Sequence, residues 1–138
     1  MTTKDELGNS IYNVTRILVI EDETHIRKII MRLLRQIGFR LIDEAEDGAK
    51  GLEEPVRVKP NIVLCDIHME PVDGLTFLKS VRSLGRRELS DLPVIFLTAD
   101  TQVTTVAEAK DLRVDGYLAK PVSMKALKDR IDRVIHRT

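Results

Sequence analysis

Short runs of β-branched and other apolar residues alternate with longer amphipathic stretches along this chain of 138 residues. Five such runs are expected to be strands, over residues 16–20, 40–45, 61–65, 93–97 and 115–119. Apolar residues at helical spacing predict helices over 26–37, 48–58, 75–84, 101–112 and 123–136. Gly38 and Gly85 are stop signals, and Pro55 should interrupt or kink the second helix. The alternation predicts an α/β fold: a doubly wound, five-stranded parallel sheet with helices on both faces.

Composition narrows the class of protein. Lys plus Arg and Asp plus Glu number 22 each, so the net charge gives no reason to expect binding to nucleic acid or insertion into a membrane. No apolar stretch is long enough to span a bilayer, and residues 1–14 contain no hydrophobic signal core. The single cysteine excludes a disulfide framework and suits a reducing cytoplasm. We expect a loose polar leader over 1–14 and one domain over 15–138.

The third expected strand runs straight into a carboxylate, in the stretch VLCDIHMEPVDG at residues 63–74. A carboxylate is expensive to remove from water, so Asp66 is an unusual end for a strand buried on both faces. Asp is also a common turn residue, and taken alone Asp66 would more often be one. In an open parallel sheet, however, ligands bind outside the carboxyl ends of the strands. Asp66 is therefore a candidate site residue.

Polar residues also follow the other strands. Glu21 and Asp22 come after the first strand, Thr98 after the fourth and Lys120 after the fifth. Each has an ordinary explanation: the acids could cap a helix, the threonine could lie in a turn, and the lysine could be a surface charge. Their occurrence with Asp66 at one edge of one sheet indicates a functional site instead.

Three carboxylates that converge at this edge would repel one another. Two unit charges about 4 Å apart cost roughly 4 kcal/mol at an effective dielectric constant of about 20. A divalent cation removes this penalty, and a site made of oxygen ligands suits Mg²⁺ or Mn²⁺. Phosphate oxygens are common further ligands of Mg²⁺, and the lysine and the threonine could bind others. The set suits a phosphoryl group carried on Asp66 itself, which is known nucleophilic chemistry for a carboxylate.

The motifs around these residues resemble the receiver domains of two-component response regulators. They are the acidic pair in LVIEDE, then DIHMEPVDG, FLTAD and GYLAKP, in family order within residues 16–136. Three further segments, IRKIIMRLLRQIGF, EAEDG and SDLPVIFLTA, are similar to the single-domain chemotaxis type, known as CheY-like. The resemblance, rather than the spacing, implies a flavodoxin-like receiver fold with strand order 2-1-3-4-5.

The resemblance also implies roles for the acidic residues and the lysine. Asp66 matches the phosphoacceptor, and Lys120 matches the lysine that binds the phosphoryl group. Glu21, Asp22 and Asp66, with the backbone carbonyl of His68, would hold the metal ion.

Two further residues match the family's conformational switch: Thr98 its hydroxyl and Tyr117 its aromatic ring, which changes rotamer. Tyr117 could equally be a rim residue that packs its ring and exposes its hydroxyl. The Lys120–Pro121 bond matches a position that is usually cis in the family.

The chain departs from the family pattern at two places. Glu21 replaces the commoner aspartate, which keeps the charge but should place the metal contact through water. Glu70 stands where the family usually has proline, and Pro71 follows it, so the loop should differ in shape.

The resemblance implies a regulatory protein rather than an enzyme. It would accept a phosphoryl group on Asp66 from a sensor histidine kinase or a histidine phosphotransfer protein, in a Mg²⁺-dependent reaction, and support its own dephosphorylation. We expect output by binding of a protein or a second copy, through the helix at 101–112, the strand at 115–119 and the helix at 123–136. His68 and Asp100 should flank the phosphoryl group and tune its lifetime.

Several alternatives remain open from the sequence. The chain could be the receiver part of a longer regulator. An aspartate-nucleophile phosphohydrolase usually has a second Asp where this chain has His68, and a flavin-binding carrier usually has a Ser/Thr-rich phosphate loop after its first strand. A transition-metal site with His25 and His68 would leave the lysine and the threonine without a task. Cys65 should point away from Asp66 into apolar packing.

Overall fold

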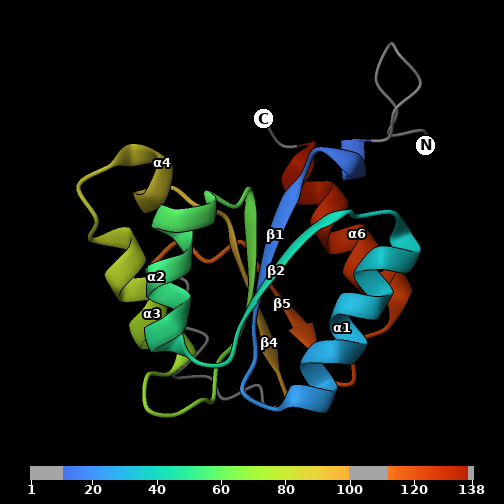
Figure 1. Cartoon of the computed structure of the whole chain (residues 1–138), viewed down its shortest axis with the longest axis horizontal. Helices are drawn as coiled ribbons and strands as arrows, with labels where there is room; N and C mark the ends of the chain where they lie inside the picture. Colours follow the sequence, from blue (N-terminus) through green and yellow to red (C-terminus); the bar gives the residue numbers. More distant parts are fainter. Residues whose placement is uncertain (1–10, 100–111, 137–138) are drawn as a thin grey trace.

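The computed structural model describes residues 11–99 and 112–136, and in this part of the chain five parallel strands form one sheet (Figure 1). The strands are β1 (Arg16–Ile20), β2 (Leu41–Ala45), β3 (Ile62–Asp66), β4 (Val94–Thr98) and β5 (Gly116–Ala119). Their order across the sheet is β2-β1-β3-β4-β5, and every neighbouring pair is parallel. The expected fold class and strand order are confirmed.

Helices cover both faces of the sheet. They are α1 (Thr24–Ile37), α2 (Gly48–Val58), α3 (Gly74–Arg82), α4 (Arg87–Ser90) and α6 (Met124–Ile135). In Figure 1, α1 and α6 lie on one side of the sheet, and α2, α3 and the short α4 lie on the other. The helix expected over 101–112 lies outside the described residues, apart from its last position. None of the described helices has the length and apolar character needed to cross a bilayer.

The central strands β3 and β4 are buried at every position, because helices pack on both of their faces. Successive side chains point to opposite faces of a strand, so they enter two separate cores. Leu64 packs in the core on the side of α1 and α6, whereas Val63 and Cys65 pack on the other side, with Phe77 of α3. Cys65 thus lies in apolar packing, as expected, and burial raises the pKa of its thiol well above its usual value.

The helices begin and end at residues suited to those positions. Gly38 ends α1 with a φ of 128°, which favours glycine, and its N–H donates to the carbonyl oxygens of Leu34 and Arg35. The Asp47 side chain caps α2 by accepting a hydrogen bond from the Lys50 N–H. This helix continues through Pro55 to Val58, so the interruption considered from the sequence does not occur. Pro55 is buried, and its packing offsets part of the lost hydrogen bond.

The packed domain begins earlier than residue 15. Tyr12, in a 3₁₀ turn over Ile11–Asn13, is only 5% exposed, and its ring lies 4.6 Å from the ring of Phe39. Its hydroxyl donates a 2.6 Å hydrogen bond to Asp132 on α6. The loose leader that we expected over 1–14 therefore does not extend to residues 11–13, while residues 1–10 lie outside the described part of the chain. One turn was too short to show a periodic pattern.

Replacing Tyr12 should test whether this turn belongs to the folded domain. We expect Tyr12→Ala to lower the free energy of unfolding by about 3 kcal/mol, because it removes a buried ring. Urea unfolding measures the difference. Val14→Ala is the matched control: Val14 is 67% exposed, so the change should stay within about 0.5 kcal/mol. Equal unfolding midpoints for Tyr12→Ala and the unchanged protein would show that the turn adds no stability.

Candidate functional site

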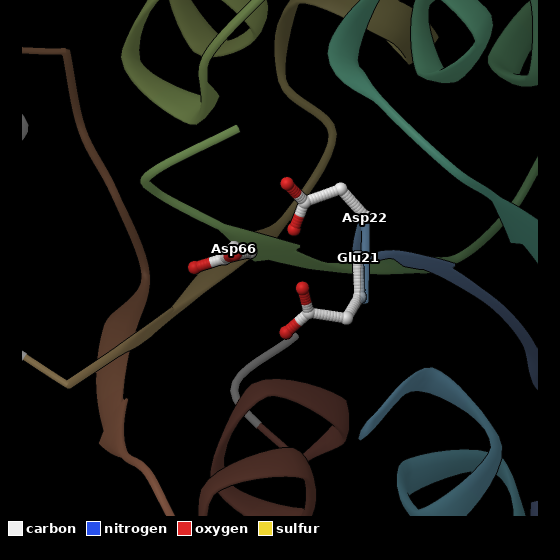
Figure 2. Close-up of side chains that lie close together, drawn as sticks. All are labelled: Glu21, Asp22 and Asp66. Atoms are coloured by element: carbon white, nitrogen blue, oxygen red, sulfur yellow. The ribbon is translucent and has the colours of Figure 1, made fainter. Parts of the chain in front are cut away.

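Three carboxylates meet at the carboxyl edge of the sheet (Figure 2). Glu21 and Asp22 follow β1 directly, and Asp66 is the last residue of β3. These strands are neighbours with Ile20 paired to Cys65, so the residues after this pair come together. One oxygen of each carboxylate lies within 4.8 Å of one oxygen of each of the others. Glu21 and Asp66 are buried, whereas Asp22 faces solvent.

Lys120 supplies the positive charge of this pocket. Its Nζ lies 2.6 Å from Glu21 Oε1 and 3.1 Å from Asp66 Oδ1, and the lysine side chain is 14% exposed. Burial lowers the pKa of the Lys120 ammonium, but the hydrogen bonds and charges of the two carboxylates outweigh it, and the pKa ends above its usual value. The Lys120 N–H also donates to the Thr98 carbonyl oxygen at 2.9 Å, which ties the end of β5 to β4. The lysine is thus charged and held in place.

The donor set fits a hard divalent cation. Three carboxylates face one ammonium, so an excess of negative charge remains. Burial raises the pKa of Asp22, and the neighbouring Glu21 raises it further, against the lowering effect of Lys120. A divalent cation would relieve this repulsion, and hard cations such as Mg²⁺ prefer the oxygen ligands that the three carboxylates offer. In the described part of the chain, the one group suited to a metal contains no histidine, and His25 is exposed, which speaks against a His–carboxylate site.

Arg27 holds the backbone of Glu21 in place beside the pocket, and the sequence analysis did not predict this role. Its Nη1 donates a 2.6 Å hydrogen bond to the Glu21 carbonyl oxygen, and its Nε donates a 2.8 Å bond to Glu44 on β2. The side chain is only 9% exposed. A signal did exist in the pattern: Arg27 shares a helix face with Ile30, Met31 and Leu34, all buried. A charged side chain on the buried face of a helix needs a hydrogen-bond acceptor or an opposite charge close to it.

The start of α3 packs closely beneath Asp66. A side chain at Gly74 would place its Cβ only 2.4 Å from the Asp66 carbonyl oxygen, so this approach requires glycine. The Gly74 N–H donates to the Ile67 carbonyl oxygen at 2.8 Å, and the Asp73 side chain caps α3 through the Thr76 N–H. The loop between β3 and α3 is therefore closed by a hydrogen bond between Ile67 and Gly74, and the Asp73 cap fixes the start of α3.

The two residues expected to act as a switch lie on β4 and β5. Thr98 is the buried last residue of β4 and pairs with Ala119 across the sheet. Tyr117 is partly buried on β5, with its ring 6.2 Å from that of Phe96. Burial raises the pKa of its hydroxyl. Thr98 thus lies at the same edge as the acids, and a change of rotamer at Tyr117 stays a prediction.

His68 lies at the mouth of the pocket. It is exposed and lines an open depression with Asp22, Met69, Glu70 and Asp73. The metal contact expected for its backbone carbonyl stays a prediction. The Lys120–Pro121 bond is cis, as the resemblance implied, and so is Glu70–Pro71 in the loop where the chain departs from the family. Asp100, the second residue expected to tune the phosphoryl lifetime, lies outside the described residues.

Comparison with known proteins agrees with this geometry. Residues 17–132 match the family model of the response regulator receiver domain. Chemotaxis protein CheY-3 of Vibrio cholerae serotype O1 is 33% identical over 122 residues, which are 88% of this chain and 92% of that protein. Chemotaxis protein CheY of Pseudomonas aeruginosa is also 33% identical over 122 residues, with 88% and 97% covered.

Solved structures agree as well. The structure of Vibrio cholerae chemotaxis protein CheY4 superposes with a TM-score of 0.80 at 25% identity, over 87% of this chain and 98% of that one. A two-component response regulator from Clostridium difficile has a TM-score of 0.79 at 21% identity, with 89% and 97% covered, which supports the fold alone. With the family model matched over most of its length and two relatives at one-third identity, this chain belongs to the response regulator receiver domain family, as a CheY-like receiver domain in two-component signalling.

Proposed function

We propose that this receiver domain is a phosphorylation-controlled switch in which Asp66 accepts the phosphoryl group. One observation carries the proposal: the Lys120 ammonium lies 3.1 Å from an Asp66 oxygen, and two further carboxylates lie beside that oxygen. A carboxylate placed beside a fixed ammonium has a counter-charge ready for the oxygens of an incoming phosphoryl group. The donor is a phosphohistidine on a sensor histidine kinase or a histidine phosphotransfer protein, as in the family.

A divalent cation, Mg²⁺ or Mn²⁺, belongs to this proposal. Asp22 and Asp66 would hold it with the backbone carbonyl of His68, and Glu21 would reach it through water. When bound, it would neutralise charge that develops on the phosphoryl oxygens. Asp22 is the exposed member of the three carboxylates, so it is the side of the pocket from which a cation can enter.

The transfer itself is a displacement at phosphorus. An Asp66 carboxylate oxygen attacks the phosphorus atom, a new P–O bond forms, and the P–N bond to the donor histidine breaks. The electron pair of that bond stays on the imidazole nitrogen. A donor whose other ring nitrogen carries a proton leaves directly as neutral histidine, and a donor without that proton takes one from water at the nitrogen that held the phosphorus. Lys120 contributes by binding a phosphoryl oxygen, and Thr98, at the same edge of the sheet, would bind another.

The acceptor can be tested with a small acyl phosphate. Incubation with Mg²⁺ and acetyl phosphate should add the mass of one phosphoryl group, and hydroxylamine should remove it. We expect no addition in Asp66→Asn, because an amide cannot form the acyl phosphate, and none after chelation of the metal with EDTA. Asp129→Asn, on the exposed face of α6, serves as the control and should be labelled normally. Full labelling of Asp66→Asn would show that the acceptor lies elsewhere.

Output is proposed to pass through β5, α6 and residues 101–112. The last of these segments reads TQVTTVAEAKDL, and β-branched residues in its first half disfavour a stable helix. Lys125 and Lys128 on α6 form ion pairs with Asp129 and Asp132, so the basic character of this helix is largely balanced. Thr98 and Tyr117 would couple the phosphoryl group to this face, where a protein partner or a second copy binds.

Hydrogen exchange can locate the responding face. We expect phosphorylation to change amide protection in peptides that cover 101–119 and the start of α6, because the coupled residues lie on β4 and β5. Peptides from α2 should exchange as before. This helix packs against α3 and β2, on the face of the sheet opposite to α6. A response confined to α2 and α3 would contradict this assignment.

The lifetime of the phosphoryl group is proposed to depend on His68 and Asp100. Each stands two positions after a site residue, Asp66 or Thr98. Hydrolysis needs a water molecule in line with the breaking bond, and a bulky imidazole or a short carboxylate should place that water poorly. We therefore expect slower self-dephosphorylation than in the chemotaxis type, which usually has an amide and a longer acid there.

The double variant His68→Asn, Asp100→Glu tests this idea. We expect faster loss of the phosphoryl group, by about tenfold if water positioning is restored, with nearly unchanged Mg²⁺ affinity. Loss of the added phosphoryl mass over time measures the rate. A decay rate equal to that of the unchanged protein would exclude both positions as determinants of lifetime.

A further inference from the structure

The amino edge of the sheet, opposite to the acidic pocket, is held by one buried arginine. Arg82 is the last residue of α3, and its side chain is only 8% exposed. Its Nη1 donates to the carbonyl oxygens of Ser90 and Leu92 at 3.1 and 2.6 Å, in the connection between α4 and β4. Its Nε donates to the Leu112 carbonyl oxygen at 2.8 Å and its Nη2 to that of Arg113 at 3.0 Å, just ahead of β5. One side chain thus joins the chain ahead of β4 to the chain ahead of β5.

A guanidinium is the side-chain group best suited to this position. It presents five N–H donors in a fixed planar arrangement and stays charged in proteins. Burial lowers the pKa of the Arg82 guanidinium, whereas the charge of Asp115, 3.7 Å away, acts in the opposite direction. The four carbonyl oxygens are bound through three different nitrogen atoms of Arg82. A lysine has a single nitrogen with three donors and could not replace this arrangement.

Asp115 completes the connection between the two strands. Its Oδ2 accepts a 2.7 Å hydrogen bond from the Val94 N–H, and its own N–H donates to the Val94 carbonyl oxygen at 2.8 Å. Val94 is the first residue of β4, and Asp115 directly precedes β5. The amino end of the edge strand is therefore fixed to its neighbour by a side chain and by the backbone.

The backbone at Arg113 shows that surrounding contacts determine this connection. Its φ is 61°, in the left-handed region that residues with a side chain seldom adopt. Such a conformation persists where neighbouring groups hold it in place. The Arg113 carbonyl oxygen is bound by Arg82, and its guanidinium lies 3.3 Å from Asp91. The chain ahead of β5 thus keeps an unfavourable backbone angle because both of these groups are held.

We propose that Arg82 is a positioning residue that fixes the amino end of the edge strand, so that the response to phosphorylation is confined to the carboxyl end of β5. This inference rests on the proposed function, because it describes how far a change at Asp66 spreads. At its carboxyl end β5 is followed by Lys120, which forms an ion pair with Asp66 and donates its N–H to the Thr98 carbonyl oxygen. A strand of four residues that is fixed at one end and connected to the phosphoacceptor at the other responds by pivoting about the fixed end.

Amide hydrogen exchange, resolved by NMR, reports on both ends of β5. Within the region that should respond, the Lys120 N–H reports on the carboxyl end, and the N–H groups of Val94 and Asp115 report on the amino end. We expect phosphorylation by acetyl phosphate to change the exchange rate of Lys120 by about tenfold or more and those of Val94 and Asp115 by less than about twofold. Changes of equal size at both ends would overturn the proposal.

The variant Arg82→Lys keeps the charge and removes the hydrogen bonds to the four carbonyl oxygens. In unphosphorylated protein, we expect the Val94 and Asp115 amides to exchange about tenfold faster or more. The Asn61 N–H, which donates to the Arg16 carbonyl oxygen at the same edge of the sheet, should exchange as before. Phosphorylation of this variant should then alter Val94 and Asp115 as well. The rate of labelling by acetyl phosphate should stay within about twofold, because the pocket lies at the other edge.

Arg113→Gly is the matched control at this edge. It removes the contact with Asp91 but keeps the carbonyl oxygen that Arg82 binds, and glycine adopts a φ of 61° without strain. We expect the Val94 and Asp115 amides to exchange as in the unchanged protein. If Arg113→Gly accelerates them as much as Arg82→Lys does, the Arg113 side chain fixes the strand end and the proposal is overturned.

A role of Arg82 in overall stability alone predicts a different pattern. If Arg82→Lys accelerates Asn61 as much as Asp115, the arginine supports the whole fold and the proposal is overturned, and unchanged rates at Val94 and Asp115 overturn it as well. If this variant does not fold, the comparison of Lys120 with Asp115 in the unchanged protein still decides. If acetyl phosphate does not label the unchanged protein, the proposed function fails, whereas exchange in unphosphorylated Arg82→Lys still shows whether the arginine fixes the end of β5.

Discussion

The ion pairs of Lys120 with two buried carboxylates are the interaction on which the carboxyl edge of this sheet depends. Glu21 is fully buried, and a charged group in that position is tolerated only with a close partner. Lys120 is this partner and also forms an ion pair with Asp66, so one ammonium balances the charge of carboxylates at the ends of two strands, β1 and β3. Removing it would leave two buried charges unpaired, which is far more costly than the pair itself is stabilising.

The same lysine determines how the edge strand is attached. Its side chain contacts the ends of β1 and β3, while its N–H binds the Thr98 carbonyl oxygen of β4. A change in charge at Asp66 therefore alters a residue that is bonded to β1, β3 and β4 and that follows β5 directly. This connectivity gives a physical basis for a signal that starts on a central strand and is read at the edge of the sheet.

The sequence predicted the layers, the position of each strand to within one residue at either end, and the residues gathered at the sheet edge, because each depends on local patterns. Apolar runs such as residues 61–65 mark strands buried on both faces, and the parallel arrangement brings their ends together. It did not predict contacts that depend on three-dimensional reach. Arg27 binds a backbone carbonyl and a carboxylate on another strand, and Tyr12 bonds to a residue 120 positions away. The place of Arg27 on an apolar helix face indicated that it needs a partner, but no periodic pattern identifies which residue that partner is, and the same holds for Tyr12.

The residues of the site stand on two kinds of strand: buried central strands and a less buried edge strand. The acids stand at the ends of β1 and β3, whose neighbours on both sides are strands, and β3 is buried at every position. Lys120 and Tyr117 belong to the other part: β5 has four residues, lies at the edge of the sheet and is fully buried at only one of them. Fewer buried contacts mean a lower free energy of local rearrangement. The buried strands β1 and β3 can therefore hold the carboxylates in place. The edge strand β5 can respond to a change at these carboxylates, because Lys120, which follows β5, forms ion pairs with Glu21 and Asp66.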